Sequence, residues 1–437
     1  MQDNKDEKRE ARRKKRIKSQ VVSYFVLAIL VVLIAFLGYR GYKAAAKKIE
    51  EINRPSESLN EIAEASASED STGMITSPDE FVLEPESETV SEEDVSEPVD
   101  QSVKEYVDNM PIEQKVSALF LVSPESLTGV DVVAIAGDGT KNALSTYGVS
   151  GLIYEDKNIV SAEQFKEMLS STKDMYKELY NTDIWLAVRE EGAVNTLAGS
   201  NLGIEKVPAA GEYTEEGEDY QTFLTIGNYL NEYGINMNLG ICGDIKKDDS
   251  SAIGNRAFGS DAETVSSMVT SGVKATIDSG VEPCITGFIG RGAATNETLM
   301  APATVELTEE EIASNVDVYK KGALAGAKCI MLSNTMVMEL TDDLPCSLSP
   351  EAIAQLRENA EYKGVIMTDY LDEAAITDKY SADEVGVMAV CAGADIIVRP
   401  ADFKLTYDGI MKAISEGVIT EERINESLYR IYSVKMQ

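Results

Sequence analysis

The segments Lys328–Ser333, Gly364–Thr368 and Asp395–Arg399 read KCIMLS, GVIMT and DIIVR in the amino-acid sequence. Each has a continuously apolar centre instead of an alternation of apolar and polar residues. This pattern is typical of strands that are buried on both faces, as they are in a parallel sheet with both faces covered. The three segments therefore predict a parallel α/β fold for this part of the chain.

Five further segments of this kind precede them, and longer amphipathic stretches separate the eight. Three of these stretches, Ala162–Tyr180, Ala262–Asp278 and Glu309–Ala325, have the composition and length of helices. Eight strand–helix alternations from residue 103 onward predict a (β/α)8 TIM-type barrel, with a doubly wound open sheet as the alternative on pattern alone. The predicted strands are Ala118–Val122, Ser150–Tyr154, Ile184–Arg189, Ile235–Leu239, Glu282–Phe288, Lys328–Ser333, Gly364–Thr368 and Asp395–Arg399.

The bulk composition narrows the classes of function. The 437 residues carry a formal net charge of −35, and this excess of carboxylates argues against a nucleic-acid partner. The sequence contains no histidine, which excludes Ser-His and Cys-His nucleophile pairs and histidine zinc sites. We expect no metal and no cofactor. Cysteines without CxxC spacing predict buried free thiols at Cys242, Cys284, Cys329, Cys346 and Cys391.

The N-terminal residues have the pattern of a membrane anchor. Residues 1–20 are densely basic and form a predicted cytoplasmic tail, and residues 21–39 form a predicted single transmembrane helix without charges. The heavier positive flank precedes the apolar run, so we expect the amino end in the cytoplasm and the rest outside the cell. A cleaved signal peptide is the alternative, because Ala44–Ala46 offers small residues, but the apolar run is longer than usual for one.

Residues 40–102 separate this anchor from the predicted barrel at residues 103–437. No Lys or Arg lies between Arg54 and Lys104, and Ser, Glu, Asp and Pro dominate the stretch. Such a segment buries too little apolar surface to offset its ordering entropy, and its like charges repel one another. It is predicted to be a disordered acidic linker that holds the barrel away from the membrane.

In a barrel of this kind, functional side chains lie at the C-terminal ends of the strands. The residues expected there are polar and carry both charge signs, which suits a ligand rich in hydroxyl groups. They are Glu155, Asp156, Arg189 to Glu191, Asn238, Asp244, Arg256, Thr286 to Arg291, Asn334, Asp369 and Arg399.

Several blocks of sequence, in order, resemble those of one known family. Pro111–Val122 (PIEQKVSALFLV), Gly234–Asp244 (GINMNLGICGD), Gly254–Asp261 (GNRAFGSD) and Gly364–Asp378 (GVIMTDYLDEAAITD) are similar to successive segments of its barrel. From about Pro111 onward the chain resembles the N-terminal domain of glycoside hydrolase family 3, particularly the single-domain β-N-acetylglucosaminidases. The resemblance implies a (β/α)8 barrel and retaining hydrolysis of β-linked N-acetylglucosamine.

The same resemblance assigns roles to several residues. Asp369 takes the position of the nucleophile, and Arg256 takes that of an arginine which contacts the sugar. Glu297 lies on the loop that carries the family's general acid/base, so it is the candidate for that role. The other candidate substrate-binding residues are Glu191, Arg189, Asp244, Arg291 and Asn334.

The departures from the family are equally specific. The family's strand three ends in an aspartate followed by QEGGRV, whereas residues 189–194 here read REEGAV, so Arg189 replaces the aspartate. Residues 286–292 read TGFIGRG in place of KHFPGHG, and residues 297–299 read ETL in place of Asp-Ser-His. Asn334 replaces the histidine of the Ser-His after strand six. The family's histidine acid/base and its sugar-binding Lys-His pair are therefore absent.

Retaining hydrolysis needs a nucleophile and a second group that protonates the leaving oxygen and then activates water. Loss of such an acid/base costs about 10²–10⁴-fold in rate. The substitutions favour a catalytically impaired relative that binds a glycan or a protein partner at the cell surface. A surviving retaining β-N-acetylglucosaminidase that acts on cell-wall fragments through Asp369 remains open. A third hypothesis is a site changed to bind an anion through Arg189, Arg291 and Arg399.

Overall fold

The computed structural model describes residues 99–200, 202–213 and 217–437. The predicted cytoplasmic tail (1–20), the predicted transmembrane helix (21–39) and nearly all of the predicted linker (40–102) lie outside the described residues. Within the part of the chain that is described, no helix is both long and apolar enough to cross a membrane. The membrane anchor therefore stays a prediction from the sequence.

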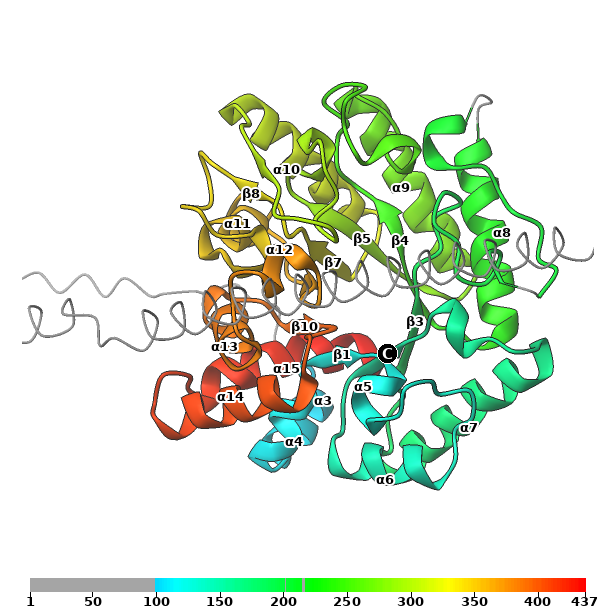
Figure 1. Cartoon of the computed structure of the whole chain (residues 1–437), viewed down its shortest axis with the longest axis vertical. Coiled ribbons are helices and arrows are strands. Elements are labelled where there is room, and N and C mark those ends of the chain that lie inside the picture. Colours follow the sequence, from blue (N-terminus) through cyan, green and yellow to red (C-terminus); the bar gives the residue numbers. More distant parts are fainter. Residues whose placement is uncertain (1–98, 201, 214–216) are drawn as a thin grey trace, which may run out of the picture. The chain divides into compact units, whose positions relative to one another are not determined.

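The described residues form a closed barrel of parallel strands, which confirms the predicted (β/α)8 fold (Figure 1). Around the barrel the strands follow the order β1-β10-β9-β7-β5-β4-β3-β2, and every neighbouring pair is parallel. Each strand overlaps one of the eight predicted segments. The barrel strands are β1 (Phe120–Val122), β2 (Gly151–Ile153), β3 (Trp185–Val188), β4 (Met237–Cys242), β5 (Glu282–Phe288), β7 (Cys329–Leu332), β9 (Val365–Tyr370) and β10 (Ile396–Val398).

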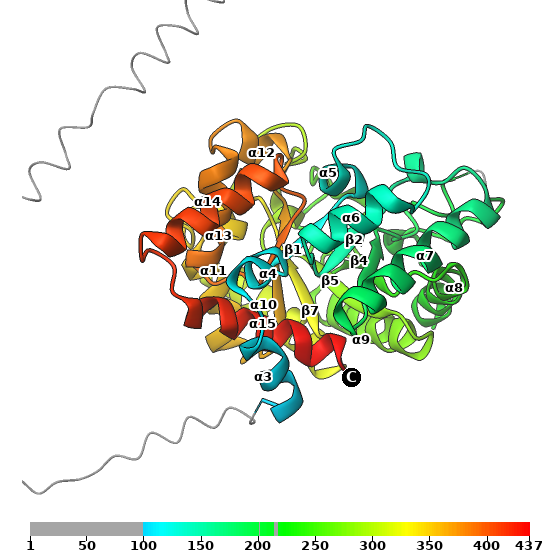
Figure 2. The ribbon, with the colours of Figure 1, turned by 90° about the horizontal axis from the view of Figure 1, so that it is seen from below.

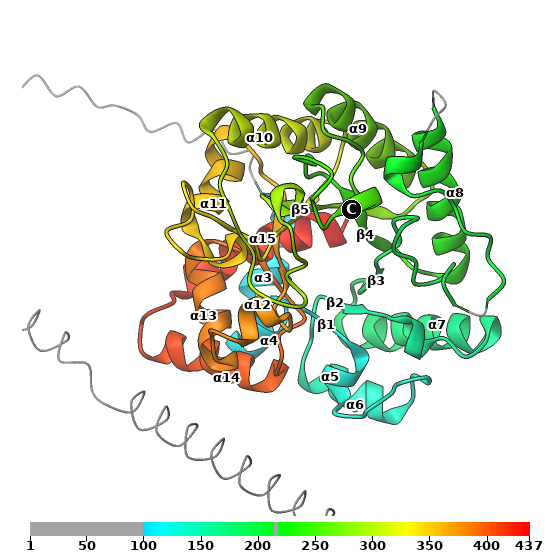
Figure 3. The ribbon, with the colours of Figure 1, turned by 45° about the horizontal axis from the view of Figure 1, so that its top comes forward.

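Helices surround the strands, and α7, α8, α9, α10 and α13 are seen as parts of an outer ring in Figure 3. The predicted bounds of α7 and α9 are correct, and α10 ends at Leu324 instead of Ala325. The helices are α3 (Gln101–Asp108), α4 (Ile112–Ser117), α5 (Pro124–Thr128), α6 (Asp138–Thr146), α7 (Ala162–Tyr180), α8 (Glu218–Tyr233), α9 (Ala262–Asp278), α10 (Glu309–Leu324), α11 (Pro350–Ala354), α12 (Ala374–Thr377), α13 (Ala382–Ala392), α14 (Phe403–Ser415) and α15 (Glu421–Lys435).

Local sequence fixes where the longest helices begin. The Ser161 and Thr308 side chains accept hydrogen bonds from the backbone three residues later and start α7 and α10. The Asp261 carboxylate accepts from Thr264 N at 2.8 Å and starts α9. These caps satisfy amide groups that have no partner inside the helix, and each contributes about 1 kcal/mol. They hold the outer helices in register with the strands that precede them.

The N-terminal end of the barrel is closed by α15, which packs against α3 and α4 (Figure 2). The last turn of α15 places Lys435 inside, where its Nζ donates to Ser150 O at 3.0 Å. The ammonium group lies 4.9 Å from the ring centre of Tyr176, 5.6 Å from that of Trp185 and 5.2 Å from that of Tyr432. Burial lowers the pKa of Lys435 to about 7. This end of the barrel is therefore sealed, and the opposite end carries the candidate site.

The five cysteines are free thiols, as the sequence predicts. Cys242, Cys284, Cys329 and Cys346 are buried, but Cys391 is exposed on α13, contrary to the expected burial. Burial raises the pKa of Cys242 to about 11 and that of Cys346 to about 12. The buried thiols are therefore apolar packing groups of the barrel.

Candidate active site

Asp369 lies within β9, close to its C-terminal end, and its side chain is buried in the mouth of the barrel. Its backbone N–H donates to Ser347 Oγ at 2.9 Å, and its Oδ1 accepts from Tyr370 N at 2.9 Å. Among the described residues, the second carboxylate oxygen, Oδ2, has no hydrogen-bond partner. Asp369 thus offers one engaged oxygen and one free oxygen, as an attacking carboxylate requires.

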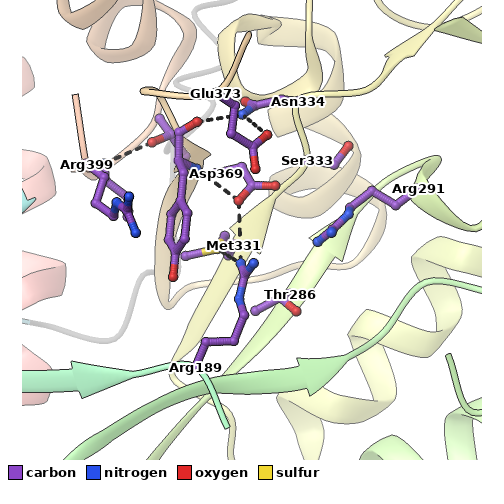
Figure 4. A network of polar contacts seen from close by, with 12 residues as sticks. Arg189, Thr286, Arg291, Met331, Ser333, Asn334, Asp369, Glu373 and Arg399 are labelled. Carbon is purple, nitrogen blue, oxygen red and sulfur yellow. Dashed lines mark hydrogen bonds and ion pairs between the residues drawn. The ribbon is translucent and has the colours of Figure 1, made fainter. Parts of the chain in front are cut away.

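Arg189, directly after β3, places its guanidinium beside Asp369 (Figure 4). Its Nη2 lies 3.6 Å from Asp369 Oδ1, and its Nε lies 3.7 Å from Glu191 Oε1. The same guanidinium contacts Met331 Sδ at 3.7 Å and stacks over the Tyr370 ring at 4.5 Å from the ring centre. Of the alternatives left open by the sequence, the structure shows Arg189 paired with both acidic neighbours.

A second guanidinium, that of Arg399, stacks on the Tyr370 ring, 4.6 Å from the ring centre. Arg399 follows β10 and is itself paired, with Glu155 Oε1 at 2.6 Å and with Asp372 Oδ2 at 2.8 Å. The side chain of Tyr370 is therefore held by cation–π contacts on a wall of the mouth.

Glu191 and Arg256 form a bidentate ion pair. Arg256 Nε donates to Glu191 Oε2 at 2.7 Å, and Arg256 Nη2 donates to Glu191 Oε1 at 3.0 Å. Burial alone would raise the pKa of Glu191, but the charge and hydrogen bonds of Arg256 outweigh it and hold the pKa below its usual value. Arg256 and Glu191, which are both predicted to bind the substrate, thus contact each other, and the buried Glu191 carboxylate orients the Arg256 guanidinium.

Glu297, the candidate acid/base, lies on the loop after β5 and is about one-third exposed. Its Oε2 is 3.3 Å from Arg291 Nη2, and its Oε1 is 3.8 Å from Arg256 Nη1. Glu297 thus lies between two guanidinium groups of the mouth. Leu299, at the position of the family's histidine, is 60% exposed.

Asp244, which follows β4, is buried and accepts a hydrogen bond from the backbone of this loop. Its Oδ2 accepts from Gly292 N at 3.0 Å. Burial raises the pKa of Asp244 to about 7, although the Gly292 hydrogen bond and the nearby Arg291 charge both oppose the rise. Its observed contacts hold the loop backbone, so it positions Arg291.

Glu373 is a carboxyl group of the site that sequence analysis missed. It precedes α12, and Asn334 Nδ2 donates both to Glu373 Oε2 at 3.0 Å and to Tyr370 O at 2.8 Å. Figure 4 shows the Glu373 carboxyl group next to that of Asp369 and pointing toward it. Burial, and then the negative charge of Asp369, raises the pKa of Glu373 to about 7.

The loop after β5 also contacts α12 directly. Ala375 N donates to Thr298 O at 3.1 Å, and Ala374 N approaches Leu299 O at 3.4 Å. The loop therefore lies against the start of α12, where Glu373 is. The three segments of the mouth that follow β5, β7 and β9 are joined through Thr298, Asn334 and Glu373.

Each of the four arginines of the mouth is paired with a carboxylate. Arg189, Arg256, Arg291 and Arg399 each lie within 4 Å of a carboxylate oxygen. This pairing gives no support to the hypothesis of a basic anion-binding patch. A cavity of about 550 Å³ lies apart from the mouth, between α10 and the segments that follow β8 (Met336–Val337) and α11. It is lined by Ile312, Val316, Lys320, Glu339, Leu340 and Gln355, and contains none of the predicted site residues.

A closed parallel barrel with buried carboxylates and arginines at the C-terminal ends of its strands defines a TIM-barrel protein whose candidate site lies at that end. Residues 112–434 match the domain described as "Glycosyl hydrolase family 3 N terminal domain". The chain belongs to glycoside hydrolase family 3, as the sequence blocks predict.

Similar proteins agree with this assignment. The chain is 25% identical over 218 residues to Beta-hexosaminidase LpqI of Mycobacterium bovis, covering 48% of this chain and 56% of that protein. It is 23% identical over 325 residues to Beta-hexosaminidase A of Pseudoalteromonas piscicida, covering 67% of this chain and 54% of that protein. The chain thus spans a little over half the length of these relatives.

Solved structures have the same fold. A glycoside hydrolase family 3 beta-N-acetylglucosaminidase from Paenibacillus superimposes with a TM-score of 0.69 at 27% identity, covering 75% of this chain and 62% of that one. A beta-N-acetylhexosaminidase from Beutenbergia cavernae gives a TM-score of 0.64 at 23% identity, covering 75% of this chain and 99% of that one.

Proposed function

We propose that this chain is a glycoside hydrolase family 3 domain with impaired hydrolysis, which binds a glycan containing N-acetylglucosamine at the cell surface. The observation that carries the proposal is the Arg189 guanidinium, 3.6 Å from Asp369 Oδ1 and stacked on Tyr370. The membrane anchor at residues 21–39 and the acidic linker would hold the barrel outside the cell. A protein partner in place of a glycan is the other outcome of the binding test below.

Arg189 opposes hydrolysis for two physical reasons. First, retaining glycosidases pass through a transition state that resembles an oxocarbenium ion, and a fixed guanidinium next to the nucleophile repels that positive charge. A unit charge at about 4 Å is worth roughly 4 kcal/mol at an effective dielectric constant of about 20. Second, the same guanidinium stacks on the Tyr370 ring, so it loses that contact if it moves away from Asp369.

The proposed ligand class rests on what remains of the mouth. The Arg256–Glu191 pair keeps a guanidinium fixed at the position of the family's sugar-contacting arginine. The Asn334 side-chain oxygen, Oδ1, has no partner among the described residues and adds an acceptor for sugar hydroxyls. The similar proteins described above bear the names of β-hexosaminidases and β-N-acetylglucosaminidases.

The binding test measures affinity for chitin oligosaccharides by calorimetry, using the full chain in a detergent without sugar groups. Wild type and Asp369→Asn should bind with similar affinity, because the proposed binding does not use a nucleophile. Arg256→Lys should bind at least about tenfold more weakly, since a lysine cannot make the bidentate contact that fixes the side chain. Absence of sugar binding by the folded wild type would exclude a glycan ligand and direct the search to protein partners.

A second candidate function is a retaining β-N-acetylglucosaminidase with Asp369 as nucleophile. The observation that favours it is the buried Glu373 carboxyl group beside Asp369, because the family's histidine would otherwise have no replacement. Turnover of an aryl N-acetyl-β-glucosaminide at a rate typical of histidine-bearing family members would favour this function over an impaired one.

A further inference from the structure

The free oxygen of Asp369 and the carboxyl group of Glu373 form a buried acidic pair. Asp369 is 1% exposed and its Oδ2 has no partner among the described residues, while Glu373 is 5% exposed. A buried polar atom without a partner costs about 1–3 kcal/mol, so its retention calls for a ligand or a function. The negative charge of Asp369 opposes ionisation of Glu373, so Glu373 holds its proton more strongly than an exposed carboxyl group does.

We propose that Glu373 is the proton donor and acceptor for hydrolysis at Asp369, in place of the histidine that this chain lacks. The inference rests on the proposed function, because it concerns the impaired hydrolysis that remains in a domain that binds N-acetylglucosamine. Glu373 would be a catalytic residue, since its carboxyl group would contact the glycosidic oxygen.

The position of Glu373 supports this role. The loop after β5, which carries the general acid/base in the family, lies on the start of α12 through Thr298 O and Leu299 O. Leu299, at the histidine's position, has no proton to give and is directed to solvent. The titratable group at the start of α12 is Glu373. The loop after β5 and the start of α12 are in contact, and in our proposal the proton comes from Glu373 on α12's side of that contact instead of from the loop.

The environments of the two carboxyl groups divide their roles. Asp369 has the Arg189 guanidinium and the Tyr370 N–H at Oδ1, so its other oxygen, Oδ2, is the one free to attack. Glu373 is held by the neutral Asn334 amide, and burial with the Asp369 charge raises its pKa to about 7. A carboxyl group with a raised pKa beside a second carboxyl group with a free oxygen is the pattern of an acid and a nucleophile in one site.

Two other carboxylates of the mouth are held in ion pairs with arginines. Glu297 is bridged between Arg291 and Arg256, and Glu191 is held by Arg256. Both oxygens of Glu297 face guanidinium groups, and the Arg256 charge holds the pKa of Glu191 below its usual value. Glu373 is therefore a better candidate than Glu297, which the sequence suggested.

The chemical steps balance with these two groups. Asp369 Oδ2 attacks the anomeric carbon, the bond to the leaving oxygen breaks, and that oxygen takes the proton of Glu373. Water then attacks the anomeric carbon and gives a proton to the Glu373 carboxylate, while the ester bond to Asp369 breaks. Glu373 ends protonated and Asp369 ends ionised, so the site returns to its starting state.

The test compares two aryl N-acetyl-β-glucosaminides on the full chain in a sugar-free detergent. The leaving group is 2,4-dinitrophenolate, which departs without a proton, or phenolate, which needs one. Glu373→Gln keeps the shape and the Asn334 contact but cannot transfer a proton. We expect it to lower kcat/KM for the phenyl substrate by about 10²-fold or more. For the dinitrophenyl substrate we expect a loss of less than about tenfold in kcat/KM.

Azide provides a second measurement on the same variant. Azide needs no base to attack the anomeric carbon, so it should restore dinitrophenyl turnover in Glu373→Gln and yield the glycosyl azide. Equal losses on both substrates, or no loss on either, would overturn the role of Glu373. If wild type releases no dinitrophenolate above Asp369→Asn, the inference is also wrong, whereas impaired hydrolysis and glycan binding would stand. Wild-type turnover without any affinity for chitin oligosaccharides would instead count against the proposed ligand.

Discussion

The Nη2 atom of Arg189 lies 3.6 Å from Oδ1 of Asp369, although the two residues come from β3 and β9 of the barrel. The other Asp369 oxygen, Oδ2, has no partner among the described residues. The contact places a guanidinium beside the residue at the position of the family's nucleophile, and it leaves the other carboxylate oxygen free. The proposed impairment of hydrolysis and the retained nucleophile position therefore concern the same two residues.

The buried pair should be visible in stability measurements. Arg189→Met removes the cation and leaves the Asp369 and Glu191 charges less compensated, so the free energy of unfolding should fall by about 1–3 kcal/mol. Asp369→Asn in the same background should lose less than the sum of the two single variants, because the two residues interact. Chemical denaturation of the four proteins checks this, and strictly additive losses would show that the pair contributes nothing.

Glu373 should make stability depend on pH between about 4.5 and 7. Its pKa is raised to about 7 in the folded protein from an ordinary value of 4.5, so the unfolded chain releases the proton first as pH rises. The free energy of unfolding should therefore fall through this interval and level off above it. Glu373→Gln should remove this contribution. In Asp369→Asn it should be smaller, because the negative charge that helps to raise the pKa of Glu373 is gone.

At higher pH, Lys435 should change the free energy of unfolding in the opposite direction. Burial lowers its pKa from 10.5 to about 7, so between these values the unfolded chain holds the proton that the folded protein has released. The free energy of unfolding should rise with pH across this interval in wild type and should do so less in Lys435→Met. Lys412→Met, on an exposed side chain, is the matched control and should follow wild type. Parallel pH curves for Lys435→Met and wild type would contradict the lowered pKa.

The fold was predictable because it depends on local patterns. Each barrel strand is a short apolar run, and helices such as α7 and α9 begin at capping residues that the sequence displays. The ends of those strands indicate which residues face the mouth, and Arg189, Asn334 and Asp369 lie at or directly after β3, β7 and β9.

The contacts within the mouth could not be predicted in the same way. Arg189 had two possible acidic partners and an anion as a third option, and only the three-dimensional arrangement shows it contacting Asp369 and Glu191 together. Glu373 was missed because an acidic residue at the start of a helix is ordinarily a favourable charge near the helix dipole. The signal that was present is its position four residues after Asp369, at the start of a short helix with buried apolar residues.

Arg189 should restrain hydrolysis at Asp369. This restraint is measured by comparing wild type, Arg189→Ala and Asp369→Asn in the hydrolysis of a nitrophenyl N-acetyl-β-glucosaminide, with kcat/KM as the readout. We expect Arg189→Ala to be at least about tenfold faster than wild type, which requires only about 1.4 kcal/mol of the repulsion to be relieved. Asp369→Asn should have no turnover, alone or combined with Arg189→Ala. A folded Arg189→Ala protein with turnover equal to or below that of wild type would show that Arg189 does not restrain Asp369.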